Sequence, residues 1–204
     1  MPKKSIAVLI SGSGTNLQAL INGVNNKIIN GEIKIVISNK EEAYGLERAE
    51  KEGIKNIYLD DKKEKDDKDL LNLFKNENID LIVLAGYLKI LSKDLVSTYR
   101  NKLINIHPSL IPSFCGKNYY GLKVHQEVVK YGVKISGATT HFVNEETDEG
   151  PIILQKSIEV NYEDTAESLQ KKVLKIEHEI LVKTVMLFCE DRIKVTGRKV
   201  KILR

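Results

Sequence analysis

The stretch SIAVLISGSGTNLQALINGV, residues 5–24, sets the class of the fold. Its first part, residues 5–10, is an apolar run that ends at Ser-Gly, which predicts a buried strand. Apolar residues then recur at helical spacing, at Leu17, Leu20, Ile21 and Val24, so a helix is expected over residues 15–26. A buried strand that leads through a glycine-rich turn into a helix is typical of α/β domains.

The rest of the first half repeats this alternation. Further strands are expected at residues 33–37, 56–59 and 79–85. Helices are expected at residues 43–52, which Gly53 closes, and around the apolar positions Leu70, Leu71 and Phe74. We therefore predict an α/β fold with a Rossmann-like, mostly parallel central sheet and helices on both faces.

The second half contains longer elements. A strand at residues 102–107 ends at a proline, and a loop containing glycine and tyrosine follows it. The pattern then predicts a helix at 122–131, extended segments at 139–143 and 152–160, a long helix at 164–190 and a hairpin at 192–203. Asp164 or Thr165 is expected to cap the long helix. No repeat and no linker interrupts the chain, so residues 1–204 are expected to form a single domain.

Composition excludes several classes of protein. No apolar run reaches the roughly 18 residues that a membrane helix needs. The two cysteines lie far apart, which argues against a disulfide framework and against a zinc site. The net charge of +4 is mild, whereas a nucleic-acid binder usually carries a dense basic patch. We expect a cytoplasmic protein that binds no membrane and no nucleic acid.

A metal site is also not expected from the histidines. The residues to consider are His107, His125, His141 and Asp148. No pair of them has the HxxxH spacing that places two ligands on one face of a helix. The sequence therefore predicts no metal.

The glycine-rich loop, residues 11–16, predicts a phosphate site. Its small residues let the backbone approach a ligand, and the amides at the start of the following helix favour an anion. A dinucleotide site fits less well, because Leu17 replaces the third glycine of GxGxxG and no acidic residue ends the second strand. The Walker lysine is absent as well. A tight turn without a ligand remains the alternative.

The strand that ends at His107 carries the sharpest chemical signal. Because side chains alternate along a strand, Asn105 and His107 share one face at its carboxyl end, where open α/β sheets bind their ligands. The amide of Asn105 could stabilise an oxyanion, and His107 could move a proton near neutral pH. The alternative is a hydrogen-bonded pair that only orders the loop.

Two sets of carboxylates are further candidates. In the acidic turn at residues 144–150, one carboxylate beside His107 would raise the pKa of the imidazole, but the sequence does not select Asp148 from its three glutamates. Glu177 lies in or beside the apolar stripe of the long helix and therefore needs a partner. That partner is either a substrate hydroxyl or a lysine or water at the edge of the stripe.

Five segments together resemble the phosphoribosylglycinamide formyltransferase family. They are residues 11–16 (SGSGTN), 84–91 (LAGYLKIL), 105–112 (NIHPSLIP), 140–143 (THFV) and 148–151 (DEGP). They span nearly the whole chain in the family's order. The NIHPS segment is shared by the wider folate-dependent formyltransferases, so it points to the chemistry more than to the substrate.

The resemblance implies a role for each candidate residue. Gly14, Thr15 and Asn16 would hold the phosphate of the ribotide, and Glu177 its ribose hydroxyls. Asn105, His107 and Asp148 match the catalytic residues. The residues implied for 10-formyltetrahydrofolate are Leu88, Lys89, Ile90, Leu91, Asn105, Asn144 and the turn up to Asp148, with Lys63, next to Lys62 and Lys65, at the folate tail.

The implied reaction moves the formyl group of 10-formyltetrahydrofolate to the amine of glycinamide ribonucleotide in purine biosynthesis. Both partners are small molecules, no metal is needed, and a monomer or homodimer is expected. Three rival functions remain open. Methionyl-tRNA formyltransferase carries an additional C-terminal domain, and formyltetrahydrofolate deformylase an additional N-terminal one. The third rival is a non-catalytic module that binds a phosphorylated ligand.

Overall fold

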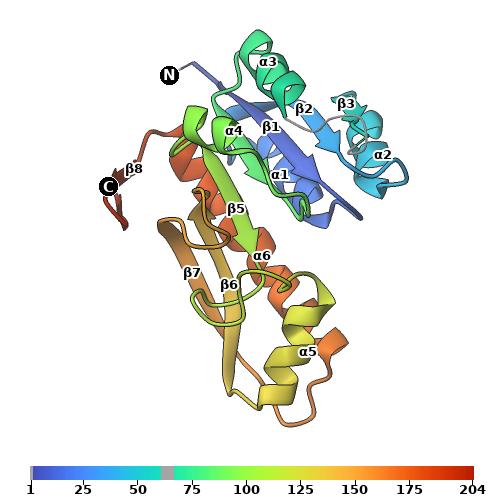
Figure 1. The fold of residues 1–204 in the computed structure, drawn as a ribbon, viewed down its shortest axis with the longest axis vertical. Coiled ribbons are helices and arrows are strands. Elements are labelled where there is room, and N and C mark those ends of the chain that lie inside the picture. The colour runs from blue at the N-terminus through green and yellow to red at the C-terminus, as the bar shows by residue number, and fades with distance from the viewer. Residues whose placement is uncertain (1, 61–66) are drawn as a thin grey trace.

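A seven-stranded sheet forms the centre of the protein, in the order β3-β2-β1-β4-β5-β6-β7 (Figure 1). The computed structural model describes residues 2–60 and 67–204. The first five strands are parallel, and the last two are antiparallel to their neighbours. The strands are β1 Lys4–Ile10, β2 Gly31–Ser38, β3 Lys55–Tyr58, β4 Leu81–Leu84, β5 Leu103–His107, β6 Ile135–Phe142 and β7 Ile152–Glu159.

Six helices and a hairpin complete the described part of the chain. The helices are α1 Thr15–Asn25, α2 Tyr44–Lys51, α3 Lys68–Asn76, α4 Lys93–Thr98, α5 Leu122–Tyr131 and α6 Ala166–Cys189. The hairpin of β8 Ile193–Thr196 and β9 Lys199–Ile202 lies where the sequence predicted it. Thr165 caps α6, because its side chain accepts a hydrogen bond of 3.2 Å from the Ser168 amide.

The side chains of β1 enter two separate cores, one on each face of the sheet. Ile6, Val8 and Ile10 pack in the core that contains α1, α5 and α6. Ala7 and Leu9 pack in the second core, together with α3 and α4. Burial on both faces explains why this strand reads as continuously apolar. The predicted fold class, with helices on both faces of the sheet, is confirmed.

Helix α4 was missed in the sequence because it is short. The side chain of Ser92 accepts a hydrogen bond from the Leu95 amide at 3.3 Å, which caps the helix. Leu95 and Val96 then bury against the second core. A serine followed by Asp94 and two apolar residues was the signal available, since serine is a preferred cap and acids favour the first turn.

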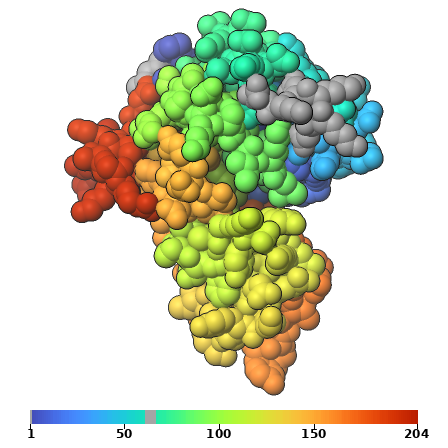
Figure 2. Space-filling view, viewed as in Figure 1, coloured from blue at the N-terminus to red at the C-terminus, as the bar shows by residue number. Residues whose placement is uncertain are grey.

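The order of the strands reverses at β1, whose neighbours are β2 and β4. Parallel strands end at the same edge, so β1, β4 and β5 bring their carboxyl ends together there, and such a switch point is where open α/β sheets bind ligands. Figure 2 shows a narrow waist between the upper part of the molecule and the lower part, which contains α5. Among the described helices, none has the length and apolar character to cross a membrane.

Candidate active site

Four polar side chains meet at the carboxyl end of β5. Asn105 lies opposite His141 on the antiparallel strand β6, and its Nδ2 is 3.1 Å from His141 Nε2. The same Nδ2 is 3.5 Å from Oδ1 of Asp148, and Nδ1 of His107 is 3.6 Å from Oδ2 of that carboxylate. The structure thus brings together Asn105, His107 and Asp148, which the sequence separates by up to 43 residues.

The loop after β5 determines which nitrogen of His107 carries a proton. Nε2 lies 3.0 Å from the carbonyl oxygen of Phe114. A carbonyl only accepts, so Nε2 must donate in this contact. In the neutral ring Nδ1 is then without a proton, and it is Nδ1 that faces Asp148. His107 therefore presents a basic nitrogen to the cluster.

The net pKa of His107 differs from the sequence-based expectation. Burial lowers the pKa of the imidazole below its ordinary value, and the neighbouring His141 adds to that effect. The charge of Asp148 and the hydrogen bond to Phe114 raise it, as expected of a carboxylate, but they do not outweigh burial. The effect expected of the carboxylate is therefore present, but desolvation outweighs it. The resting ring is accordingly neutral at pH 7.

Asp148 is the acid of the turn that reaches the cluster, while Glu145, Glu146 and Glu149 are exposed. Its Oδ2 accepts a 2.8 Å hydrogen bond from the Gly116 amide. Burial by itself raises the pKa of Asp148, but the neighbouring His141, the charge of His107 and the Gly116 amide together hold that pKa below its ordinary value. The carboxylate is therefore charged at neutral pH.

Backbone geometry aims Asp148 into the cluster. The residue adopts a left-handed φ of 58°, which is uncommon outside glycine. Two residues later the chain passes so close to β6 that a Cβ on Gly150 would collide with the carbonyl oxygen of Phe142. Only glycine permits that approach, so Gly150 fixes the turn that presents Asp148.

His141 belongs to the cluster, although the sequence analysis considered it only for a metal site that was not expected. Its Nδ1 donates to the carbonyl of Phe142 at 2.9 Å, which leaves Nε2 to accept from Asn105. The ring also lies 3.6 Å from Oδ1 of Asp148. His141 thus orients the Asn105 amide. Only the register between β5 and β6 reveals this contact, and no local pattern encodes it.

The glycine-rich loop brings the starts of two helices together. Gly14 has a φ of 68° and directly precedes Thr15, the first residue of α1. A Cβ on Gly14 would lie 2.6 Å from the Cα of Gly45, near the start of α2. The Arg48 side chain donates to the Ser13 carbonyl at 2.8 Å, which places a guanidinium beside the loop. Two helix starts and a cation make this loop electropositive.

Asn16 and Glu177 form a buried pair below that loop. Asn16 Nδ2 donates to Glu177 Oε2 at 2.9 Å, although 161 residues separate them in sequence. Burial raises the pKa of Glu177, and the hydrogen bond from Asn16 only partly opposes it. The predicted alternative, an edge residue paired with lysine or water, does not apply to this buried glutamate. Asn16 Oδ1 is buried and has no hydrogen-bond partner.

The residues predicted for folate occupy different environments. The amide of Leu88 donates to Ser11 Oγ at 2.9 Å, which ties the segment after β4 to the glycine-rich loop. Leu88 and Ile90 expose 55% and 80% of their surface, so their side chains are open to a ligand, whereas Leu91 packs in the second core. Lys89 forms an ion pair of 3.1 Å with Asp67. Lys63, with its neighbours Lys62 and Lys65, lies outside the described residues.

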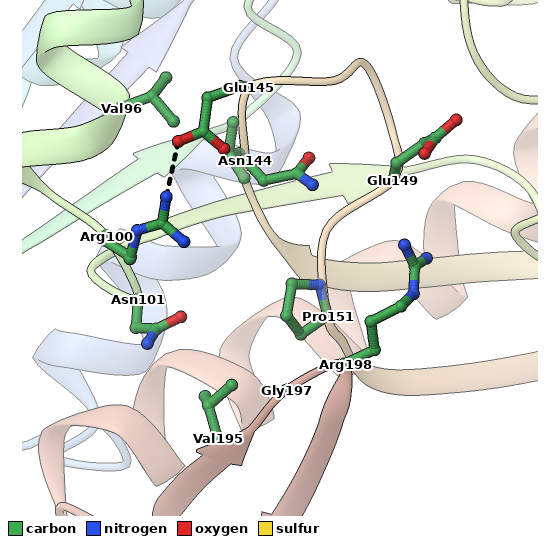
Figure 3. A pocket seen from close by; sticks show the side chains of 11 residues that line it. Val96, Arg100, Asn101, Asn144, Glu145, Glu149, Pro151, Val195, Gly197 and Arg198 are labelled. Carbon is green, nitrogen blue, oxygen red and sulfur yellow. Dashed lines mark hydrogen bonds and ion pairs between the residues drawn. The ribbon is translucent and has the colours of Figure 1, made fainter.

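A pocket of about 430 Å³ is lined in part by the acidic turn (Figure 3). Asn144, predicted to contact folate, lines it and has a buried Oδ1 without a hydrogen-bond partner. Arg100 and Glu145 are joined at its rim by a hydrogen bond of 2.7 Å. Asn105 and His107 do not line this pocket. It therefore borders the turn that carries Asp148 without including the cluster at the end of β5.

No set of three or more His, Cys, Asp or Glu side chains in residues 2–60 and 67–204 is arranged to hold a metal ion. The cluster at β5 instead contains donors and acceptors that already pair with one another. An amide aimed by a histidine, a basic imidazole nitrogen and a carboxylate are together suited to acyl transfer.

Comparisons with known proteins agree with this geometry. A family model described as Formyl transferase matches residues 4–185. A phosphoribosylglycinamide formyltransferase of Escherichia coli (strain K12) is 38% identical over 94% of this chain and 90% of its own length. The chloroplastic phosphoribosylglycinamide formyltransferase of Arabidopsis thaliana is 39% identical over 94% of this chain, which spans 68% of that protein.

Two solved structures share the fold. The glycinamide ribonucleotide transformylase 1 of Symbiobacterium toebii has a TM-score of 0.93 and 39% identity, and covers 99% of this chain and 95% of its own. A formyltetrahydrofolate deformylase of Pseudomonas syringae pv. tomato has a TM-score of 0.90 and 29% identity, over 99% of this chain and 66% of its own. The family model matches most of this chain, and the chain therefore belongs to the formyl transferase family.

Proposed function

We propose that this protein transfers the formyl group of 10-formyltetrahydrofolate to the amine of glycinamide ribonucleotide, a step of purine biosynthesis. The observation that carries the proposal is the arrangement of Asn105, His107 and Asp148 at the same sheet edge as the glycine-rich loop with Asn16 and Glu177. The residues at the end of β5 are suited to acyl transfer. The glycine-rich loop with Asn16 and Glu177 offers contacts for a phosphorylated sugar. The relatives named for this reaction support the choice of substrates.

The reaction begins at His107. As the amine nitrogen forms a bond to the formyl carbon, the nitrogen becomes acidic and must lose a proton. Nδ1 is the ring atom without a proton, because Nε2 is committed to the Phe114 carbonyl. It therefore accepts that proton, and the imidazolium that results is stabilised by Asp148 at 3.6 Å. The lowered pKa of His107 keeps the ring neutral, and so ready to act as a base, before the substrate binds.

The oxygen of the formyl group becomes an oxyanion in the tetrahedral intermediate. Nδ2 of Asn105 carries two hydrogens, one of which is held by His141. The second has only a long contact of 3.5 Å with Asp148, so a developing oxyanion would be a better acceptor for it. The protonated ring of His107 adds a positive charge that also stabilises the oxyanion.

The intermediate then collapses. The bond between the formyl carbon and the folate nitrogen breaks, and the electron pair leaves on that nitrogen. The proton held on His107 Nδ1 passes to it, with Asp148 as the counter-charge, which restores the neutral ring. The products are the formylated amine and tetrahydrofolate, and neither a covalent enzyme intermediate nor a metal is required by these steps.

The remaining residues bind the two substrates in this proposal. Gly14, Thr15 and Asn16 hold the phosphate, with Glu177 at the ribose hydroxyls. The exposed Leu88 and Ile90, the backbone of residues 88–91 and Asn144 hold the folate. We further propose that residues 1–204 act as one domain, as a cytoplasmic monomer or homodimer with only small-molecule partners and no nucleic acid.

A formylation assay with both substrates, run with and without the amine, tests the proposal. Formation of formylated product that depends on the amine supports transfer. The similar deformylase structure favours a second candidate, hydrolysis of the formyl folate. Release of formate at the same rate without the amine would select that reaction instead. If folate does not bind at all, the formyl-transfer proposal fails and only the phosphate site remains.

A further inference from the structure

The loop between β5 and α5 touches both proton-handling residues through its backbone. The Phe114 carbonyl accepts from Nε2 of His107 at 3.0 Å, and the Gly116 amide donates to Oδ2 of Asp148 at 2.8 Å. No side chain of the loop is involved in either contact. The geometry of the reacting groups therefore depends on whatever fixes the backbone at these two positions.

That backbone does not adopt this path by local preference. Phe114 has a φ of 51°, in the left-handed region that non-glycine residues rarely occupy. Such a conformation persists only where surrounding contacts determine it. Gly116 and Asn118 follow with positive φ values as well, so the loop has several strained or turning positions in a short stretch.

An aromatic clamp holds the loop, and it consists of Phe114, Tyr119 and Tyr131. The ring of Phe114 meets that of Tyr119 edge-to-face at a centroid distance of 6.4 Å, and that of Tyr131 at 5.9 Å. Such edge-to-face pairs are favourable arrangements of aromatic rings. Tyr131 belongs to helix α5, so the clamp fastens the loop to a regular element. Phe114 and Tyr119 also pack against the main core.

We propose that Phe114 is a positioning residue for formyl transfer, and that the aromatic clamp sets the tautomer of His107. With the Phe114 carbonyl in place, the proton stays on Nε2 and Nδ1 is free to act as the base. If the carbonyl moved away, the ring would instead favour a proton on Nδ1, because that nitrogen faces the carboxylate of Asp148. Nδ1 of His107 would then hold a proton and could not act as the base. This inference rests on the proposed function.

Substitution of the clamp separates positioning from simple stability. Phe114→Ala should lower kcat about tenfold to a hundredfold, which is at or below the roughly 10²–10⁴-fold that a general base contributes, because the ring of His107 is still present. KM for both substrates should stay nearly unchanged, because no clamp residue is among those proposed to bind either substrate. Phe114→Tyr keeps the ring and should restore the rate. Tyr120→Ala, in the same loop and 55% exposed, is the matched control and should behave as the wild type.

The decisive readout is the tautomer itself. Histidine-selective ¹⁵N labelling of the full chain, with His107→Gln to assign the signal, should show a bare Nδ1 in the wild type and a protonated Nδ1 in Phe114→Ala. If Phe114→Ala does not fold, Tyr131→Ala replaces it, since Tyr131 is 77% exposed and loses little burial. It should shift the tautomer in the same direction.

The outcomes separate cleanly. A folded clamp variant with the tautomer and kcat of the wild type would overturn the proposal, and so would an equal change in Tyr120→Ala. The ¹⁵N spectrum needs no substrate. A wild type that forms no formylated product but whose tautomer depends on Phe114 would therefore remove the proposed reaction and leave the positioning role standing.

Discussion

Two buried carboxylates of this protein have pKa values shifted in opposite directions. Glu177 is 7% exposed and the side chain of Asp148 is 9% exposed, so burial alone does not distinguish them. Glu177 has one hydrogen bond, from Asn16, and burial raises its pKa. Asp148 has the Gly116 amide and two histidines, and these lower its pKa against the effect of burial. The number of partners decides the direction in which each pKa is shifted.

The opposite pKa shifts of Asp148 and Glu177 match the roles proposed for the two ends of the site. At the end of β5 a fixed negative charge is needed to support an imidazolium, and the cluster supplies it before substrate arrives. Below the glycine-rich loop, Glu177 has few partners of its own, which leaves its carboxyl oxygens available to substrate hydroxyls. We expect changes in the first region to act on kcat and changes in the second to act on KM.

The largest effect is expected from His107→Ala. Removal of the base and of one oxyanion contact should lower kcat by about 10²–10³-fold, the cost of an oxyanion donor. KM for the ribotide should change little, because the contacts proposed for its phosphate and ribose are made by other residues. Steady-state formylation rates check this, and added imidazole should restore part of the activity. Near-normal turnover in the variant would contradict the proposed mechanism.

Asp148→Asn should have the next largest effect. The amide keeps the shape of the carboxyl but not the charge that stabilises the imidazolium, so kcat should fall about 10²-fold. Because the pKa of Asp148 is lowered in the folded protein, its charge stabilises the fold above its unfolded-state pKa, and that contribution is lost as pH falls through the folded-state value. Stability measured against pH should fall less steeply in acid for the variant. An unchanged acid limb would contradict the assignment.

Glu177→Gln should separate binding from stability. Loss of one hydrogen bond to a charged group costs about 1.5–3 kcal/mol, so KM for the ribotide should rise about 10- to 100-fold while kcat stays close to normal. Because the pKa of Glu177 is raised, the wild-type fold loses stability as pH rises through that value. The variant cannot ionise and should be the more stable protein at alkaline pH in urea unfolding. A fall in kcat with unchanged KM would contradict the expectation that changes below the glycine-rich loop act on KM.

The smallest effect is expected from Arg100→Ala. The pair of Arg100 and Glu145 fastens the outer side of the acidic turn at 2.7 Å, but the arginine side chain is 66% exposed. Exposed ion pairs contribute about 0–1 kcal/mol and are screened by salt. Thermal unfolding at low and high ionic strength should show a small difference that salt removes. A large loss of kcat would mean that the turn is held from outside rather than by Gly116.

Features that depend on a local pattern of residues are predicted well from the sequence. Strands β1 and β4 are recognisable because burial on both faces makes them apolar throughout. Asn105 and His107 are recognisable as a pair because strand alternation places them on one face. Helix α5 was predicted at its observed bounds, residues 122–131, because apolar spacing and Gly132 at its end agree.

The features that the sequence does not reveal depend on the pairing of strands and on hydrogen bonds of backbone groups. The contact of His141 with Asn105 requires the register of β5 against β6, which no local pattern specifies. The contacts of Phe114 and Gly116 are made by carbonyl and amide groups that every residue carries. The carboxylate's effect on the pKa of His107 was predicted, but the net lowering of that pKa was not, because burial is a property of the assembled fold.

The contact between Gly14 and Gly45 has a consequence for evolution. A Cβ on Gly14 would meet Gly45 at 2.6 Å, and a Cβ on Gly45 would collide with Ile10. Neither glycine can drift alone, and a double change offers no escape because both new methyl groups would enter filled space. The two positions therefore constrain each other where α1 and α2 begin. The structure therefore disfavours any side chain at these two positions, where the starts of the two helices meet.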